Sequence, residues 1–397
     1  MSEPKLWTKD FIIVSMINFF LTTVFYLLIV IMAAYAVNEY DASTSLAGLV
    51  TGIFIIGALI GRLFTGRSIE SAGRRKTLFI GLILFTLMTI LYFFSTSISS
   101  LLIIRFFHGF TLGIASTATG TIVAQLIPAS RKGEGIGYYS MSATLATAIG
   151  PFIGLYMSQN TSYQIIFSFC LALGITSLLT AFLVYVPARD SLIKSTEEDG
   201  FKIANFIEPK AAPIAIVTLI VALCYSSVLS YINFYAAEKQ LVEVASFFFL
   251  VYSIAVLISR PFTGRLMDLK GANYVMYPAF ILFTAGMLLL STANSGITLL
   301  LSGVLIGLGF GNMQSCTQAI AVKLTPPHRL GLATSTFFIF LDAGLGFGPY
   351  LLGFIIPFVG YSTLYVALGF IVLASTMLYF LLYGKKEKNI LHGLAQQ

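Results

Sequence analysis

Twelve apolar stretches, each long enough to cross a lipid bilayer as a helix, constrain the fold of this chain more than any other feature. The hydrocarbon core of a bilayer is about 30 Å thick, which a helix spans with about 20 apolar residues. Backbone polar groups find no water there, so each stretch must satisfy its own hydrogen bonds as a helix. The sequence therefore predicts an all-α integral membrane protein. The expected spans are 11–36, 46–66, 77–95, 99–126, 135–157, 163–186, 212–236, 244–263, 273–292, 297–323, 331–356 and 361–383.

The composition agrees with a lipid environment. Hydrophobic residues make up 57% of the chain and charged residues only 10%, against about 25% charged residues in typical soluble domains. The net charge of +7 could suggest nucleic acid, but the basic residues are spread over short loops between the spans, so we expect no such partner. Cys170, Cys224 and Cys316 lie inside apolar stretches without metal-binding spacing. We therefore expect buried thiols, and neither a metal nor a cofactor.

The two halves of the chain repeat each other with a constant offset. The run Arg62-Leu63-Phe64-Thr65-Gly66-Arg67 returns as Arg260-Pro261-Phe262-Thr263-Gly264-Arg265, and 260 − 62 = 198. Such a repeat predicts two copies of one membrane unit, with binding sites between the copies near mid-bilayer. We expect a first six-helix bundle at 1–186, a linker at 187–210, and a second bundle with a short tail at 211–397. Further pairs at the same offset are Gly109 and Gly307, Pro128 and Pro326, Arg131 and Arg329, Gly133 and Gly331, and Gly150-Pro151 and Gly348-Pro349.

The basic residues predict which side of each span faces the cytoplasm. Of the 23 Lys and Arg residues, 21 fall on one side of the predicted bilayer, Lys239 falls on the other, and Arg105 falls within a span. Cytoplasmic loops carry the excess of Lys and Arg in membrane proteins. We therefore expect a multi-pass protein of the plasma or inner cell membrane with both termini and the linker in the cytoplasm.

The segment after the second span combines glycines, one carboxylate and a basic end: Gly66-Arg67-Ser68-Ile69-Glu70-Ser71-Ala72-Gly73-Arg74-Arg75-Lys76. Glycines permit a tight turn and close helix approach. The carboxylate can accept hydrogen bonds from a neighbouring helix start and from nearby Arg. The segment resembles the signature of the major facilitator superfamily, which implies a twelve-helix transporter and a loop that latches the outward-open state.

The second copy of this segment, Gly264 to Gly271, keeps Asp268 and the glycines but lacks the final Arg pair. The first copy departs from the family signature in having Glu70 where Asp is usual, and Ser68 where Leu is common. The resemblance implies an inner gate, to which we assign Gly66, Glu70, Gly73, Arg74 and Asp268.

Arg105 opens the fourth span, where a charge costs about 2.5 kcal/mol or more and should face a cavity or a partner. It resembles the second family motif, an Arg followed four residues later by a Gly, here Gly109. In proton-coupled members that Arg is implicated in proton transfer. His108 lies on the same helical face. We expect Arg105 to act in proton coupling, aided by His108; the alternative is that Arg105 only caps carbonyls of a neighbouring helix.

The fifth span carries Gly150-Pro151 and Gly154, which resembles the Gly-Pro motif of the antiporter branches of the family. Proline frees a backbone carbonyl, and flanking glycines let helices pack closely. The motif returns at Gly348-Pro349 in the eleventh span. We therefore favour export, with these residues governing closure on the outer side.

Asp342 is the only acidic residue deep within a span, so it should be protonated, paired or in contact with water. It could carry a proton, bind a cationic substrate or pair with Arg105, and we favour the first two roles. The resemblance implies that spans 1, 4, 7 and 10 line a cavity. The polar candidates in spans 1, 7 and 10 are Asn18, Tyr26, Tyr225, Tyr231, Asn233, Asn312, Gln314 and Gln318.

These features predict a secondary active transporter that exports a small organic solute while protons enter. The chain has no Gly-rich phosphate loop ending in Lys-Ser/Thr, so we do not expect ATP to drive it, and no motif supports an enzyme. Multidrug export competes with export of one metabolite, such as a siderophore or other metallophore, an amino acid derivative or a sugar. A proton-independent facilitator is a further alternative. We expect a monomer whose partners are substrate, protons and lipid.

Overall fold

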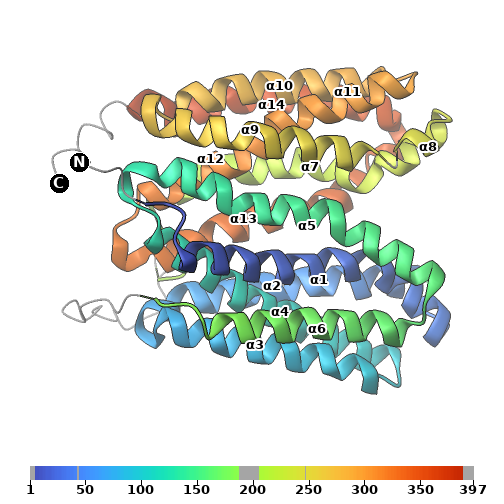
Figure 1. Ribbon diagram of the computed structural model, residues 1–397. Helices are drawn as coiled ribbons and strands as arrows, with labels where there is room; N and C mark the ends of the chain where they lie inside the picture. Colours follow the sequence, from blue (N-terminus) through green and yellow to red (C-terminus); the bar gives the residue numbers. More distant parts are fainter. Residues whose placement is uncertain (1–4, 43, 187–204, 246, 388–397) are drawn as a thin grey trace. The chain divides into compact units, whose positions relative to one another are not determined.

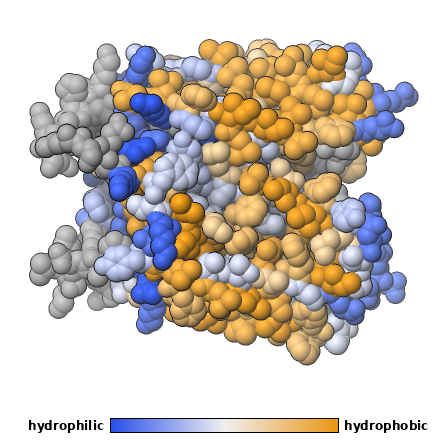
Figure 2. Space-filling view, in the orientation of Figure 1, coloured by the Kyte–Doolittle hydropathy of each residue, from blue (hydrophilic) through white to orange (hydrophobic). Residues whose placement is uncertain are grey.

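The computed structural model describes residues 5–42, 44–186, 205–245 and 247–387, and the regular structure of these residues is entirely helical. Twelve helical stretches are long and apolar enough to cross a membrane, which confirms the predicted number and the all-α fold class (Figure 1). Hydrophobic residues cover the middle of the helices, and hydrophilic residues gather at their ends (Figure 2). The three cysteines are buried and free, as expected.

Two of the twelve spans combine several α- or π-helical segments, and four others carry a short 3₁₀ segment at one end of a long helix. Span eight combines α8 and α9, and span ten combines α11, the π-helical segment η4 and α12. The helices are α1 (Lys9–Tyr40), α2 (Thr44–Ala72), α3 (Arg74–Leu91), α4 (Ile98–Leu126), α5 (Lys132–Asn160), α6 (Tyr163–Ala181), α7 (Ala212–Glu238), α8 (Val242–Ala245), α9 (Phe248–Lys270), α10 (Asn273–Ser291), α11 (Gly296–Ile306), η4 (Gly307–Gly311), α12 (Asn312–Lys323), α13 (Leu330–Gly353) and α14 (Ile356–Leu382).

The chain forms two compact units that do not coincide with its two sequence halves. Unit 1 contains residues 1–128, 145–208 and 325–339, and unit 2 contains 129–144, 209–324 and 340–397. The start of α13 therefore packs within unit 1, and the start of α5 packs within unit 2. Of the expected linker 187–210, residues 187–204 lie outside the described residues.

Helix starts are specified locally and at matching positions in the two halves. α4 begins with a capping box formed by Ser97 and Ser100, and α11 begins with one formed by Ser295 and Thr298, 198 residues later. In a capping box the two side chains satisfy backbone N–H groups that have no partner within the helix. The repeat thus extends to the signals that begin individual helices.

Small residues bring α2 and α4 into direct backbone contact in unit 1. A Cβ added at Gly109 would lie 1.9 Å from the Phe54 carbonyl oxygen, and one added at Gly57 would lie 2.0 Å from the Phe106 carbonyl oxygen. Close packing of this kind holds membrane helices together, because lipid tails provide no hydrophobic drive for their association. The contact fixes the position of the residues on α4 described below.

The signature segments belong to helices rather than to loops, contrary to the sequence expectation. α2 continues through Glu70 to Ala72, so that only Gly73 separates it from α3. α9 likewise continues to Lys270, just before Gly271. The two glycines have φ values of 91° and 100°, a region that favours glycine. The predicted spans ended too early because hydropathy marks only the apolar section of a helix, and both helices continue beyond it into polar sequence.

We predict that Gly109→Ala destabilises the protein, whereas Gly52→Ala does not. The backbone of Phe54 cannot move away from an added methyl group at Gly109, and overpacking of this kind costs about 1–3 kcal/mol. Gly52 on the same helix pair has no atom within 4 Å of an added Cβ. The apparent melting temperature of the purified protein in one detergent measures the effect. Equal melting of the two variants would contradict this account of the α2–α4 contact.

Candidate functional site

Glu70, near the end of α2, holds the start of α13 in unit 1. Its Oε1 accepts the backbone N–H of Gly331 at 3.1 Å, and its carboxylate binds the Arg74 guanidinium at 2.8 Å. Arg74 is 8% exposed and also donates to Gln125 Oε1 at 2.6 Å and to the Pro327 carbonyl at 2.9 Å. A carboxylate at a helix start gains from the helix dipole. One ion pair therefore joins the ends of α2, α3 and α4 to the segment that begins α13.

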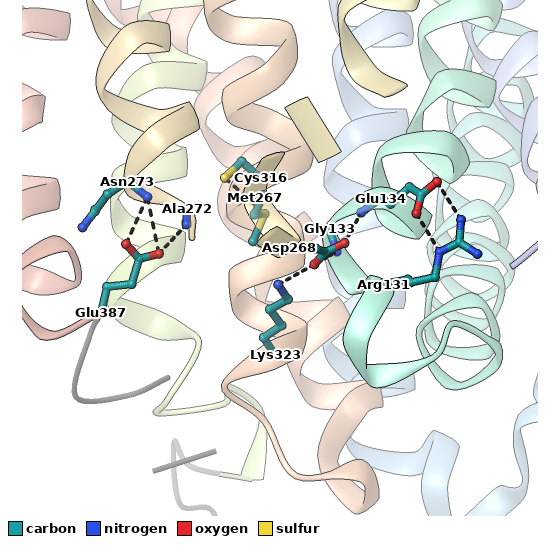
Figure 3. Close-up of polar contacts among 10 residues, drawn as sticks. All are labelled: Arg131, Gly133, Glu134, Met267, Asp268, Ala272, Asn273, Cys316, Lys323 and Glu387. Carbon is teal, nitrogen blue, oxygen red and sulfur yellow. Dashed lines mark hydrogen bonds and ion pairs between the residues drawn. The ribbon is translucent and has the colours of Figure 1, made fainter. Parts of the chain in front are cut away.

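Asp268, near the end of α9, holds the start of α5 in unit 2 in the same way (Figure 3). Its Oδ1 accepts the backbone N–H of Gly133 at 2.8 Å, and its Oδ2 accepts that of Glu134 at 2.7 Å. Lys323, at the end of α12, donates to Oδ1 at 2.6 Å. Gly133 and Gly331 occupy the same repeat position, so both acids bind equivalent helix starts.

The two copies place the cation that balances the acid on different helices. In the first copy Arg74 supplies the charge, and Gln125 supports it with a side-chain oxygen. In the second copy Ala272 stands at the position of Arg74, and Lys323 stands at the position of Gln125. The cation therefore belongs to α3 in the first copy and to the end of α12 in the second copy. The absence of the Arg pair from the second signature segment therefore does not leave Asp268 without a cation.

Glu387 caps the start of α10 in unit 2 (Figure 3). Its carboxylate accepts the backbone N–H groups of Ala272 and of Asn273, the latter at 3.2 Å. Burial raises the pKa of the Glu387 carboxyl, while the two backbone donors and Lys323 act in the opposite direction. Glu387 thus places a carboxylate at the start of α10, the helix that follows the second signature segment. No sequence pattern predicted this contact.

Arg105 on α4 is fully buried in unit 1. Its Nε donates to the Val50 carbonyl of α2 at 3.1 Å, its Nη1 donates to the Tyr92 hydroxyl at 3.3 Å, and its guanidinium lies 4.4 Å from the centre of the Phe54 ring. Its Nη2 has no hydrogen-bond partner, and Arg105 forms no ion pair within the part of the chain that the structure describes. The contact with the Val50 carbonyl is what the alternative role of Arg105, capping carbonyls of a neighbouring helix, predicts. Capping alone does not explain why the positive charge of Arg105 has no anionic partner among the described residues.

His108 is joined to Arg105 through Tyr92. A guanidinium can only donate, so the Tyr92 oxygen accepts from Arg105 at 3.3 Å, and the same hydroxyl forms a hydrogen bond with His108 Nδ1 at 3.0 Å. Thr89 donates its hydroxyl proton to the Phe85 carbonyl at 2.9 Å, so it accepts from His108 Nε2 at 3.3 Å. Nε2 therefore carries a proton, and Nδ1 supports the Tyr92 hydroxyl.

Two further buried arginines, which the charge pattern predicted in the basic loops, lie inside helices. Arg62 on α2 donates from Nη1 to Ser116 Oγ at 2.9 Å, and its guanidinium lies 4.5 Å from the centre of the Phe338 ring in unit 1. Arg260 on α9 is 1% exposed and donates from Nη2 to the Gly311 carbonyl at 3.1 Å. Both positions fall inside the expected second and eighth spans, which was the signal that could have identified them.

A π-helical segment interrupts span ten, where the sequence predicted a continuous helix. It covers Gly307–Gly311, and a wider turn of this type is frequent at functional positions. The side chain of Asn312 binds it by donating from Nδ2 to the Leu308 carbonyl at 2.8 Å. Asn312 also donates to Ser259 Oγ at 2.9 Å and accepts from Thr263 Oγ1 at 2.8 Å. This predicted cavity residue thus joins span ten to α9 within unit 2.

The other predicted cavity residues make mixed contacts. Tyr225 stacks on Phe310 with ring centroids 4.0 Å apart, and the Tyr231 hydroxyl donates to the Pro349 carbonyl at 2.5 Å. Gln318 is buried, and its Nε2 has no hydrogen-bond partner. Asn18 is buried, Tyr26, Gln314 and Asp342 are partly exposed, and the side chain of Asn233 lies outside the described part of the structure.

The glycines of the Gly-Pro motif allow α5 to lie directly on α1 in unit 1. A Cβ at Gly150 would come within 2.8 Å of Tyr26 Cβ, and one at Gly154 would come within 2.7 Å of the Leu27 carbonyl oxygen. Pro151 lies inside α5 between them. In unit 2 the glycines of α13 approach α7 equally closely. Both copies of the motif therefore mark a close helix pair.

Comparison with known proteins decides the family. The sequence profile of the Major Facilitator Superfamily matches residues 14–292 and 242–395, which together cover nearly the whole chain. The chain belongs to this superfamily. Its family and its fold are those of transporters.

Members of the superfamily with different named cargoes resemble the chain. The Staphylopine export protein of Staphylococcus aureus is 22% identical over 354 residues, covering 87% of this chain and 89% of that protein. Multidrug resistance protein 2 of Bacillus subtilis is 24% identical over 361 residues, covering 87% and 88%. The human organic anion transporter MFSD10 has a similar structure, with a TM-score of 0.77 at 15% identity over 95% of this chain and all of that one.

We predict that each signature acid protects only the helix start that it binds. Hydrogen bonds to charged groups contribute about 1.5–3 kcal/mol, so Asp268→Asn should speed amide exchange at Gly133 and Glu134 about 10- to 100-fold. Glu70→Gln should do the same at Gly331. Hydrogen–deuterium exchange with mass spectrometry measures both sites in one sample. Each variant is the control for the other, and equal exchange at both helix starts in either variant would contradict two separate contacts.

We also predict that Tyr92→Phe destabilises the transporter. Loss of the hydroxyl leaves a donor on Arg105 and the Nδ1 of His108 buried without this partner, at a cost of about 1–3 kcal/mol. Tyr185→Phe is the matched control, because Tyr185 is 66% exposed. Thermal unfolding of the two variants in the same detergent tests the expectation. A Tyr92→Phe protein as stable as the control would show that the hydroxyl does not bridge the two residues.

Proposed function

We propose that this transporter is a secondary active exporter that moves a small organic solute by proton antiport with alternating access. The observation that carries the proposal is the uncompensated Arg105 cation, which is buried in unit 1 with an unpartnered Nη2. A charge inside a membrane span is costly, and such residues are commonly kept for ion or substrate pathways. A group that changes charge during transport would explain why the site is not neutralised permanently.

Proton coupling is assigned to Arg105 on α4 and Asp342 on α13. His108 acts through Tyr92, which it holds in contact with Arg105. Neither ionisable residue has an equivalent in the other sequence half, where Gly303 and Thr144 stand at these positions. An asymmetric pair of charges within a symmetric scaffold is expected where the scaffold moves and the pair supplies the coupling.

The gates are assigned to the contacts of the two signature motifs. The acids hold the starts of α5 and α13 on the side predicted to be cytoplasmic, and breaking these contacts would open that side. The close pairing of α5 with α1 and of α13 with α7 would close the opposite side. The inner gate is formed by Gly66, Glu70, Gly73, Arg74 and Asp268, and the outer closure by Gly150, Pro151 and Gly154.

Two classes of cargo are supported by the relatives. The Bacillus subtilis relative, Multidrug resistance protein 2, supports export of several drugs, and the Staphylococcus aureus relative, Staphylopine export protein, supports export of one particular compound. The Gly-Pro motif favours export in either case. A broad substrate range in one assay would favour the first class, and a response to a single chelator or amino acid derivative would favour the second.

We expect proteoliposomes with an acidic lumen to accumulate substrate through protein inserted inside-out, with protons released to the outside. Candidate cations, chelators and amino acid derivatives would be screened for substrate-dependent proton release with a pH-sensitive dye. Asp342→Asn should abolish coupled proton release, and Arg105→Gln should reduce it strongly.

Lys385→Gln, a change at an exposed basic residue, provides the control for this assay. Transport that ignores the pH gradient and survives both substitutions would replace antiport with the facilitator alternative.

A further inference from the structure

An open groove in unit 2 lies between the start of α5 and the second half of α9. Its volume is about 350 Å³, and its lining includes Glu134 and Tyr138 from α5 together with Phe262, Arg265 and Leu266 from α9. The groove therefore combines apolar side chains with a cation and a carboxylate. No residue of the proposed coupling site lies in its lining.

The charges of this groove leave one cation without a partner. Arg131 binds both oxygens of the Glu134 carboxylate, at 2.7 and 2.8 Å. Arg265 is exposed and forms no ion pair with any described residue. A ligand with a single negative charge would complete the site.

The apolar part of the groove lies at the level where a membrane protein meets lipid head groups. Phe262 is 73% exposed, as a lipid-facing side chain of a membrane-spanning helix can be, and Leu266 beside it is partly exposed. Arg265 is five residues before the end of α9, or about 7.5 Å along the helix axis. An exposed apolar side chain on the membrane side of a cation and the helix end on the other side match an acyl chain joined to a charged head group.

The equivalent surface of unit 1 is covered by the chain itself. Arg67 stands at the position of Arg265, and its guanidinium lies 5.0 Å from the centre of the Phe206 ring. Two residues further, Glu208 binds Arg329, and its backbone N–H donates to Thr336 Oγ1 at 2.8 Å. In unit 1, therefore, an aromatic ring lies over the arginine whose counterpart, Arg265, stands open in unit 2. Glu208 pairs with Arg329, the counterpart of Arg131, which Glu134 pairs with in unit 2.

The residues on the two surfaces differ in polarity, as expected if one surface is covered by the chain and the other is open. The residues equivalent to Leu266 and Leu269 are Ser68 and Ser71. The unit 1 surface, which carries a short segment of the chain, is polar at these positions, and the open groove is apolar. The serine at position 68, where the family signature commonly has Leu, is thus specific to the covered copy.

We propose that the groove of unit 2 binds an anionic phospholipid. The phosphodiester meets Arg265, and one acyl chain lies along Phe262 and Leu266. Over Arg265 the lipid takes the place that the Phe206 ring takes over Arg67 in unit 1. Free phosphate would use only the cation, so the apolar lining beside it assigns the site to a lipid.

The test measures which phospholipid stays bound to the purified protein. Protein exchanged into an equimolar mixture of phosphatidylglycerol, phosphatidylethanolamine and phosphatidylcholine with identical acyl chains is isolated, and its retained lipid is quantified by mass spectrometry. We expect phosphatidylglycerol to be enriched over phosphatidylcholine. Arg265→Gln should lower this enrichment about fivefold, the factor for one basic residue at an anionic membrane surface. Arg265→Lys should largely restore it.

Two further variants separate the parts of the proposal. Leu266→Ser should also reduce retention, whereas Arg67→Gln, the equivalent change on the covered surface, should leave it unchanged. Glycerol phosphate at millimolar concentration should not displace the lipid. Equal retention in Arg265→Gln and Arg67→Gln would overturn the site, and displacement by glycerol phosphate would replace the lipid with a free phosphate compound.

Discussion

The contact between a carboxylate and the first amides of a helix is the interaction on which the rest of this structure depends. It occurs twice, from Glu70 to the start of α13 and from Asp268 to the start of α5. Each contact joins helices from different sequence halves into one compact unit. Helix-start amides are obligatory donors, and the helix dipole favours an anion there. A side chain of modest size can therefore hold a whole helix end, and a conformational change can release it by breaking few bonds.

Duplication explains the scaffold, and a few charged residues depart from it. Capping boxes, close glycine contacts and the two acids recur at an offset of 198 residues. Arg105 and Asp342 do not recur, and the cation beside the second acid has moved from the position of Arg74 to that of Gln125. The moved cation shows that the ion pair is kept although the sequence motif is incomplete. Arg105 and Asp342, by contrast, each occur in only one half of the sequence.

A second asymmetry concerns the surface beside each signature helix. In unit 1 the segment Phe206 to Glu208 lies over Arg67 and the start of α13. In unit 2 the matching groove beside Arg265 stands open and is lined by leucines. Since Glu134 both lines this groove and donates its backbone N–H to Asp268, a lipid bound there would touch the same helix start as the second acid. Lipid composition and the Asp268 contact would then be linked through α5.

The sequence alone determined the twelve spans, the repeat, the family and the residues of both signature motifs, because apolar length and a fixed offset are read directly from the order of residues. It placed Glu70 and Asp268 in loops, and Arg62 and Arg260 with the loop charges, because hydropathy cannot show a helix continuing past its apolar section. Only the tertiary structure supplied the Arg105–Tyr92–His108 chain, the moved cation at Lys323 and the open groove beside Arg265. These depend on which helices pack together, and long-range packing leaves no periodic trace in a single sequence.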